Sequence, residues 1–156
     1  MVEEHYSDMR LSLAGLLAGE YNWIANCANL SALLYHCLER LNWAGVYLVD
    51  EGGLVLGPFQ GKPACVRIPM GKGVCGTAAQ LLESQRVADV HEFPGHIACD
   101  SASRSELVIP LIVAGQLRGV LDLDSPERDR FSREDQRQLE KLVAGFCAHH
   151  DNVATP

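Results

Sequence analysis

The sequence has little positive charge and no long uninterrupted apolar run. It contains 13 Lys and Arg residues against 20 Asp and Glu residues, which gives a formal net charge of -7. No cluster of Lys or Arg is longer than a dipeptide. Because a surface that binds phosphates needs a basic footprint, we expect neither nucleic acid nor an anionic membrane as a partner.

The N-terminus lacks the basic flank and apolar stretch of a signal peptide, since it carries Glu3, Glu4, His5 and Asp8. No apolar stretch approaches the length needed to cross a bilayer. We therefore expect a cytoplasmic protein. In a reducing compartment, the 6 cysteines are more often catalytic, metal-binding or buried than paired in structural disulfides.

The chain has the length and composition of one domain, residues 1–156, with 47% hydrophobic residues for a single core. Its periodicities and turn residues predict the following elements. They are a helix over 20–41, strands over 43–50 and 54–56, a Gly- and Pro-rich loop over 57–76 with a short strand at 65–68, a helix over 77–83, a strand over 86–90, an irregular segment over 92–103, strands over 107–113 and 117–124, and a C-terminal helix that begins with a capping box of Ser132 and Asp135. This order predicts an α/β (α+β) fold, in which N- and C-terminal helices flank a mostly antiparallel central sheet.

The cysteines fall into two groups. Three occupy or adjoin apolar positions of predicted helices, where free cysteine behaves as a small buried hydrophobe: Cys27, Cys37 and Cys147. Three lie in or beside Gly-, Pro- and Asp-rich loops, where backbone amides can stabilise a thiolate: Cys65, Cys75 and Cys99. We expect Cys99, in His96-Ile97-Ala98-Cys99-Asp100, to be a redox nucleophile, with the other two loop cysteines as alternative resolving thiols.

A zinc site is the alternative interpretation of the loop cysteines. His96 and Cys99 have ligand-like spacing, and Cys65 and Cys75 could complete a tetrahedral set. The sequence has no close Cys-x-x-Cys pair among them, which makes the zinc signature weak. We favour the redox interpretation.

Three carboxylates are predicted to converge on one sheet face. Strand alternation in Gly119-Val120-Leu121-Asp122-Leu123-Asp124 puts Asp122 and Asp124 on the same side. Glu106 immediately precedes the predicted strand over 107–113, and the tight turn between the two strands pairs the start of that strand with the end of the aspartate strand. Such a cluster suits a cationic group, or keeps one carboxyl protonated near neutral pH through like-charge repulsion. A protonated carboxyl beside a thiolate suits the reduction of a sulfoxide, whose departing oxygen accepts protons. A solvated sheet face is the other interpretation.

Two aromatic residues share a face of the strand over 43–50. Trp43 and Tyr47 lie on either side of Gly45 at strand spacing. They could form an apolar wall for a thioether methyl group, or pack in an ordinary core. The pattern alone favours neither.

Several motifs in register resemble one family. They are Asn42-Trp43-Ala44-Gly45-Val46-Tyr47, the segment 57–65 that ends in Cys65, Gly71-Lys72-Gly73-Val74-Cys75-Gly76, the Cys99 segment and the Asp122 segment. Over nearly its whole length the chain resembles the free methionine-(R)-sulfoxide reductases, which are single GAF-domain enzymes acting on the free amino acid. The resemblance implies a GAF-like fold and the reduction of free methionine-(R)-sulfoxide, with no metal or organic cofactor.

The resemblance also implies roles for individual residues. Cys99 would attack the substrate sulfur and become a sulfenic acid, Cys65 would resolve it, and thioredoxin would reduce the Cys65–Cys99 disulfide. Cys75 matches a family cysteine, as an alternative resolver or a pocket residue. The remaining matches form an acidic pocket and a hydrophobic wall: Glu106, Asp122, Asp124, Trp43 and Tyr47.

Three further expectations concern substrate specificity, the electrostatics near Glu106 and the oligomeric state. An acidic pocket would bind the ammonium of a free amino acid and reject peptide-linked methionine. Arg104 is a bulky charge where a small polar residue is expected, so it could alter the electrostatics near Glu106. Family members are often dimers, and the apolar segment 9–17 could serve as core or as interface.

The chief competing hypothesis is a small-ligand-sensing GAF module without catalysis, because the fold alone does not establish function. A zinc-stabilised structural domain is a third possibility.

Overall fold

Six strands form one antiparallel sheet in the computed structural model, which describes residues 2–96, 101–151 and 153. Their order across the sheet is β3-β2-β1-β6-β5-β4, and every neighbouring pair is antiparallel. The strands are β1 (Trp43–Asp50), β2 (Gly53–Gly61), β3 (Arg67–Pro69), β4 (Gln85–Val87), β5 (Ser105–Val113) and β6 (Gln116–Ser125). The predicted antiparallel sheet is therefore confirmed.

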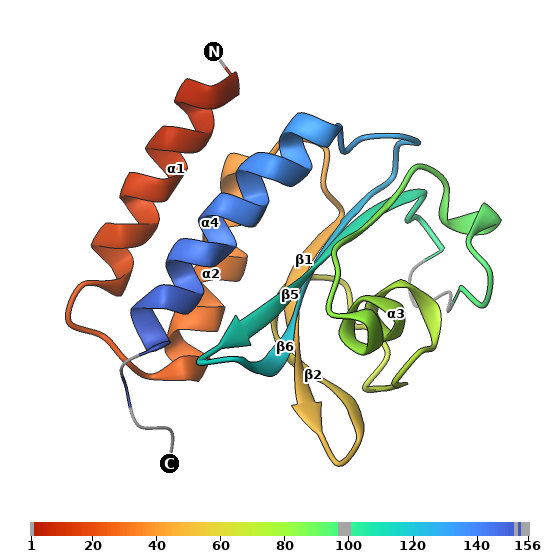
Figure 1. Cartoon of the computed structure of the whole chain (residues 1–156). Coiled ribbons are helices and arrows are strands. Elements are labelled where there is room, and N and C mark those ends of the chain that lie inside the picture. Colours follow the sequence, from red (N-terminus) through yellow and green to blue (C-terminus); the bar gives the residue numbers. More distant parts are fainter. Residues whose placement is uncertain (1, 97–100, 152, 154–156) are drawn as a thin grey trace.

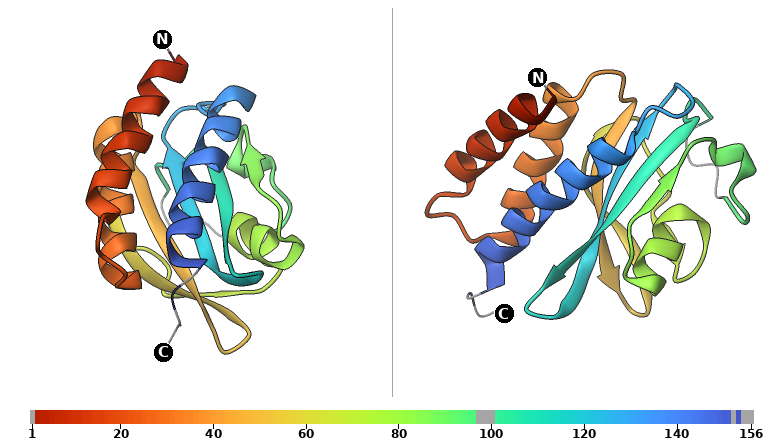
Figure 2. Two further views of the ribbon diagram at one scale, coloured as in Figure 1. Left: turned by 60° about the vertical axis from the view of Figure 1, so that its left-hand side comes forward. Right: turned by 45° about the horizontal axis from the view of Figure 1, so that its top comes forward.

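Three long helices lie on one side of this sheet, where two of them pack on it and the third packs on those two, and a short helix lies on the other side (Figures 1 and 2). The long helices are α1 (Val2–Leu17), α2 (Trp23–Cys37) and α4 (Arg133–Asp151), and the short one is α3 (Gly73–Leu81), followed after β4 by a single 3-10 turn at Val90–Glu92. None of the helices in the described part of the chain combines the length and apolar character that crossing a membrane requires.

The main core lies between the long helices and the sheet. In α1 it takes Met9, Leu13 and Leu17, which recur every four residues and are buried. The segment 9–17 thus contributes to the core of this chain, while its Leu11 is exposed. In α2 the predicted apolar stripe is wrong at Ile24, which is 51% exposed, since the buried face of this helix begins only at Asn26 and Cys27.

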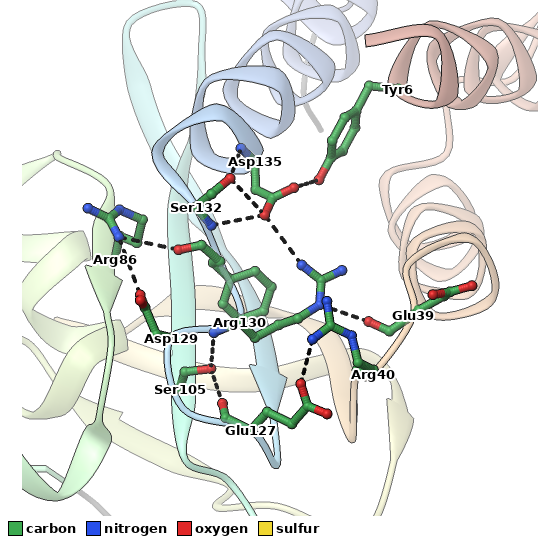
Figure 3. Close-up of polar contacts among 11 residues, drawn as sticks. Tyr6, Glu39, Arg40, Arg86, Ser105, Glu127, Asp129, Arg130, Ser132 and Asp135 are labelled. Atoms are coloured by element: carbon green, nitrogen blue, oxygen red, sulfur yellow. Dashed lines mark hydrogen bonds and ion pairs between the residues drawn. The ribbon is translucent and has the colours of Figure 1, made fainter. Parts of the chain in front are cut away.

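The start of α4 confirms the predicted capping box. The Ser132 hydroxyl accepts a hydrogen bond from the Asp135 backbone N–H (3.0 Å), and the Asp135 carboxylate accepts one from the Ser132 backbone N–H (2.9 Å). The Tyr6 hydroxyl donates to the same carboxylate (2.7 Å), as Figure 3 shows. This carboxylate therefore caps α4 and joins it to α1.

Arg130 connects this cap to the sheet (Figure 3). Its guanidinium donates to the Glu39 carbonyl (2.9 Å) and to Asp135 (3.3 Å). Its backbone N–H donates to the Ser105 hydroxyl (3.3 Å), which in turn donates to the Glu127 carbonyl (2.6 Å). These contacts fix the first residue of β5 from the helical side, next to Glu106.

The Gly- and Pro-rich segment 57–76, predicted to be a loop with one short strand, begins within β2, includes β3 and ends in the first turn of α3. Gly45 pairs with Phe59 and Tyr47 with Leu56, so β2 carries one extra residue between these pairs. The bulge contains Pro58, whose missing N–H removes no ladder bond there. The prediction of a strand only over 54–56 was wrong because proline and glycine at a bulge resemble the residues of a loop.

A buried histidine joins α4 to the start of α2. His150 is 4% exposed. The Asn26 amide group lies 3.1 Å from His150 Nε2 and also donates to the Glu20 carbonyl (3.0 Å). With the amide nitrogen as the donor in both contacts, Nε2 is the acceptor and the ring is neutral.

Stability should consequently fall in mild acid. Burial, helped by His149 and Arg118, lowers the pKa of His150 below its ordinary value of 6.5. Below that value the unfolded chain binds a proton that the folded ring resists, so the free energy of unfolding decreases as pH falls from about 6.5. In urea titrations at about pH 7.5 and about pH 5.5, His150→Gln should lose less stability than the parent chain. The exposed His36 gives the matched control, His36→Gln, and equal losses in the two variants would contradict the assignment.

Candidate active site

One face of three adjacent strands carries most of the predicted site. Across β1 and β6, Trp43 pairs with Asp124 and Gly45 pairs with Asp122. Across β5 and β6, Glu106 pairs with Asp124. Residues directly opposite in antiparallel strands point to the same side, so the aromatic residues and the three carboxylates share one face. The predicted convergence of three acids is therefore confirmed.

This face is the floor of a pocket with about 510 Å³ of empty space, part of which opens to solvent. The start of α3 forms one wall, and the segments around residues 64, 96 and 103 contribute further lining. Of the seven predicted site residues that the structure describes, six line this pocket: Trp43, Tyr47, Cys75, Glu106, Asp122 and Asp124.

The aromatic wall is a stack of rings. The centroids of Trp43 and Tyr47 lie 5.8 Å apart, and those of Trp43 and Phe59 lie 5.2 Å apart. A Cβ added to Gly45 would lie 2.7 Å from the Trp43 ring and 2.4 Å from Phe59 Cβ, so only glycine allows the stack at this position. Trp43 and Tyr47 are both buried, and both line the pocket. Core packing of these two aromatics is therefore confirmed, and their place in the lining leaves a role in substrate binding as a prediction.

The polar atoms of this wall hold the segment that carries Cys65. Trp43 Nε1 donates a hydrogen bond to the Lys62 carbonyl (3.1 Å). The Tyr47 hydroxyl donates one to the Cys65 carbonyl (2.9 Å). The wall of the pocket therefore fixes the backbone at Cys65, although Cys65 does not belong to the pocket lining.

The carboxylates titrate abnormally because they are buried together. Burial, followed by the charges of Asp122 and Asp124, raises the pKa of Glu106 well above its usual range. Burial also raises the pKa of Asp122, but hydrogen bonds from Glu106 and Cys75 oppose this rise. Asp122 is therefore the first of this pair to ionise, and Glu106 is the carboxyl that keeps its proton.

The structure corrects the position of Cys75. The sequence places it in a loop, whereas it lies in the first turn of α3 and is 5% exposed. Glycine in this segment allows close packing of the helix rather than a loop. A Cβ at Gly76 would lie 2.5 Å from the Pro69 carbonyl oxygen. Burial and the neighbouring Asp122 and Glu106 raise the pKa of Cys75 well above its ordinary value, so its sulfur is a thiol at neutral pH.

Cys65 is disulfide-bonded. The other cysteines of the described residues are free thiols: Cys27, Cys37, Cys75 and Cys147. Cys99, the predicted nucleophile, lies outside the described residues. A disulfide sulfur is not a thiolate, so Cys65 in this state is unavailable to the zinc set considered from the sequence.

Among the further residues that line the pocket, three have polar side chains and were not assigned to a substrate site from the sequence: Lys72, His96 and Ser103. Burial, helped by His91, lowers the pKa of His96. The Gly71-Lys72-Gly73 motif could have indicated Lys72, whereas nothing in the local pattern distinguishes Ser103. Arg104, expected to affect the acids, is not part of the lining and lies 3.7 Å from the Asp89 carboxylate instead.

Comparisons with known proteins show what this chain is similar to. The family model described as "GAF domain" matches residues 29–146. The chain is 56% identical over 141 residues to the free methionine-R-sulfoxide reductase of Escherichia coli (strain K12), covering 90% of this chain and 86% of that protein. It is 47% identical over 149 residues to the Saccharomyces cerevisiae protein of the same name, covering 90% and 83%. The X-ray structure of free methionine-R-sulfoxide reductase from Neisseria meningitidis in complex with its substrate superposes with a TM-score of 0.92 at 40% identity, covering 97% of this chain and 91% of that one.

Proposed function

Because the chain belongs to the GAF-domain family that includes the free methionine-R-sulfoxide reductases, we propose that it reduces free L-methionine-(R)-sulfoxide to L-methionine as a single-domain enzyme. The observation that carries this proposal is the buried carboxylate cluster beside the stacked aromatic wall in one pocket. The cluster offers negative charge and a proton, and the wall offers an apolar surface. A free amino-acid sulfoxide needs all three.

Different pocket residues interact with different groups of the substrate. The carboxylate of Asp122 binds the substrate ammonium, and the Trp43 and Tyr47 rings contact its S-methyl group. Glu106 keeps its proton at neutral pH and donates it to the sulfoxide oxygen as that oxygen gains negative charge. Peptide-linked methionine has no ammonium at this position, so it lacks the interaction that Asp122 provides.

The covalent steps use Cys99 and Cys65. The Cys99 thiolate attacks the substrate sulfur and forms a transient S–S bond while the sulfoxide oxygen takes the Glu106 proton. The oxygen then passes to the Cys99 sulfur as the original S–O bond and the transient S–S bond both break, which leaves Cys99 as a sulfenic acid and releases methionine. The Cys65 thiol then attacks this sulfur, which releases water and forms a Cys65–Cys99 disulfide. Thioredoxin, a dithiol protein of the reducing cytosol, takes the oxidising equivalents and restores both thiols.

The stereochemistry of turnover tests the proposal. Purified protein is given the separate R and S diastereomers of free methionine sulfoxide with a dithiol reductant, and the methionine formed is measured. We expect turnover of the R form only, and no turnover of an acetylated, amidated methionine-(R)-sulfoxide. Binding of the free R form without any turnover would contradict the proposal and favour a ligand-sensing module.

The resolving step predicts a difference between reductants. Cys65→Ser should retain most activity with a small dithiol, which can reduce the sulfenic acid directly, but lose roughly 10-fold or more with thioredoxin. Cys37→Ser is the matched control, because Cys37 is a free thiol that does not line the pocket. It should behave like the parent chain with both reductants. Equal thioredoxin-dependent activity of Cys65→Ser and the parent would assign the resolving role to another cysteine.

A further inference from the structure

The inner part of the pocket holds three side chains that can bind a metal, one from each of three elements. Cys75 Sγ, a carboxylate oxygen of Glu106 and one of Asp122 all lie within 4.8 Å of one another. The three residues are 5%, 6% and 5% exposed. We propose that they also form a binding site for a thiophilic divalent cation such as Zn²⁺, and that the bound cation inhibits the enzyme by occupying the substrate pocket.

One oxygen of this group points to a missing ligand. Asp122 Oδ1 is buried and has no hydrogen-bond partner among the described residues. A buried carboxylate oxygen without a partner is costly, so it is normally compensated by a bound cation or donor. Since Asp122 lines the pocket, a ligand that enters the pocket can reach this residue.

The ligand types select the metal. A thiolate with two carboxylates suits Zn²⁺, which accepts sulfur and oxygen in a tetrahedral set, whereas Mg²⁺ and Ca²⁺ prefer oxygen alone. Ligand atoms around one zinc ion lie roughly 3.5 Å apart. Cys75 Sγ and Glu106 Oε2 are already 3.9 Å apart, so small side-chain rotations complete the geometry. The fourth position would face the pocket.

Binding exchanges protons for the cation. The Cys75 S–H bond and the Glu106 O–H bond break, sulfur–metal and oxygen–metal bonds form, and two protons pass to solvent without any change of oxidation state. Among the residues that the structure describes, the other titratable groups that line the pocket are Asp124, Tyr47, His96 and Lys72. Asp124 adds attraction for the cation, while the Lys72 ammonium opposes it.

Cobalt titration tests the binding site. Co²⁺ is added to the full chain, and the near-ultraviolet charge-transfer band of a thiolate–cobalt bond is recorded together with proton release. The parent chain should bind one Co²⁺ per chain, and Zn²⁺ should displace it. Cys75→Ser should lose the band, and Asp122→Asn should weaken binding about tenfold or more.

Two cysteine variants are the matched controls, and thermal unfolding establishes that every variant is folded. Cys37→Ser and Cys65→Ser should both keep the band, because neither residue belongs to the proposed ligand set. No band in the parent chain would overturn the proposal. So would a band that persists in Cys75→Ser or disappears in either control.

The inhibitory effect rests on the proposed function, because it requires turnover. Zn²⁺ should raise the apparent KM for the sulfoxide, since cation and ammonium both need Asp122, and a chelator should restore the original value. Cobalt binding without competition by the sulfoxide would overturn the inhibitory role. A parent chain that fails to reduce the sulfoxide would instead contradict the proposed function, while the cobalt titration would still decide the binding site.

Discussion

Cys99→Ser is expected to abolish reduction of free methionine-(R)-sulfoxide, with a loss of roughly 10⁴-fold or more in turnover. A serine hydroxyl has little nucleophilic character at neutral pH without a strong base, and it cannot form the sulfenic acid that stores the oxygen. The loss should be the same with thioredoxin and with a small dithiol, because it precedes the step at which the reductant acts. Measurement of methionine formed from the R diastereomer checks the expectation.

The loss of turnover in Cys99→Ser should be nearly complete because the other free thiols among the described residues are poor replacements for the nucleophile. Burial raises the pKa of Cys27 to about 12 and that of Cys147 to about 11, and neither lines the pocket. Cys75 does line it, but burial and two neighbouring acids raise its pKa and keep it a thiol. Cys147→Ser is therefore the control, expected to retain the parent activity. Substantial activity in a folded Cys99→Ser, or its loss in Cys147→Ser, would contradict the assignment of the nucleophile.

The sequence was sufficient for the parts of the site that depend on strand geometry. Alternation in β6 places Asp122 and Asp124 on one face, and a short turn determines which residue of β5 lies opposite them, so the position of Glu106 follows from the sequence alone. The same reasoning placed Trp43 and Tyr47 together. The rule of period two determines a contact between neighbouring strands for Glu106 and a contact along one strand for Trp43 and Tyr47.

Predictions failed where tertiary packing decides the conformation. Glycine in the segment 71–76 indicated a loop, yet Gly76 lies within a helix that packs closely on the Pro69 carbonyl. Burial of Cys75 follows from that packing and is invisible in the local pattern. Lys72 and Ser103 enter the pocket through the placement of α3 and of the chain before β5, which no periodicity encodes. The network of Arg130 that fixes β5 from behind likewise joins segments far apart in sequence.

Glu106→Gln is expected to lower kcat by roughly 10² to 10³-fold, the range of a general acid, and to remove the decline of activity at high pH. The raised pKa keeps this carboxyl protonated near neutral pH, so activity in the parent chain falls as pH rises through that pKa. Glutamine has similar size but cannot supply the proton. The rising limb at lower pH, which reports formation of the nucleophilic thiolate, should remain. Asp122→Asn should differ by raising KM more than it lowers kcat, because Asp122 holds the ammonium.

Measuring the stability of Glu106→Gln distinguishes a loss of catalysis from a folding defect. Glu106 shares a buried space with Asp122 and Asp124, and their mutual repulsion and desolvation oppose folding whenever more than one is ionised. A neutral amide relieves this repulsion, so Glu106→Gln should unfold at the same or a higher urea concentration than the parent chain near neutral pH. A variant that is at least as stable but much less active has lost a function of the carboxyl rather than the fold. If it keeps the parent kcat and pH profile, the proton comes from another group, and Asp124→Asn is the variant to measure in its place.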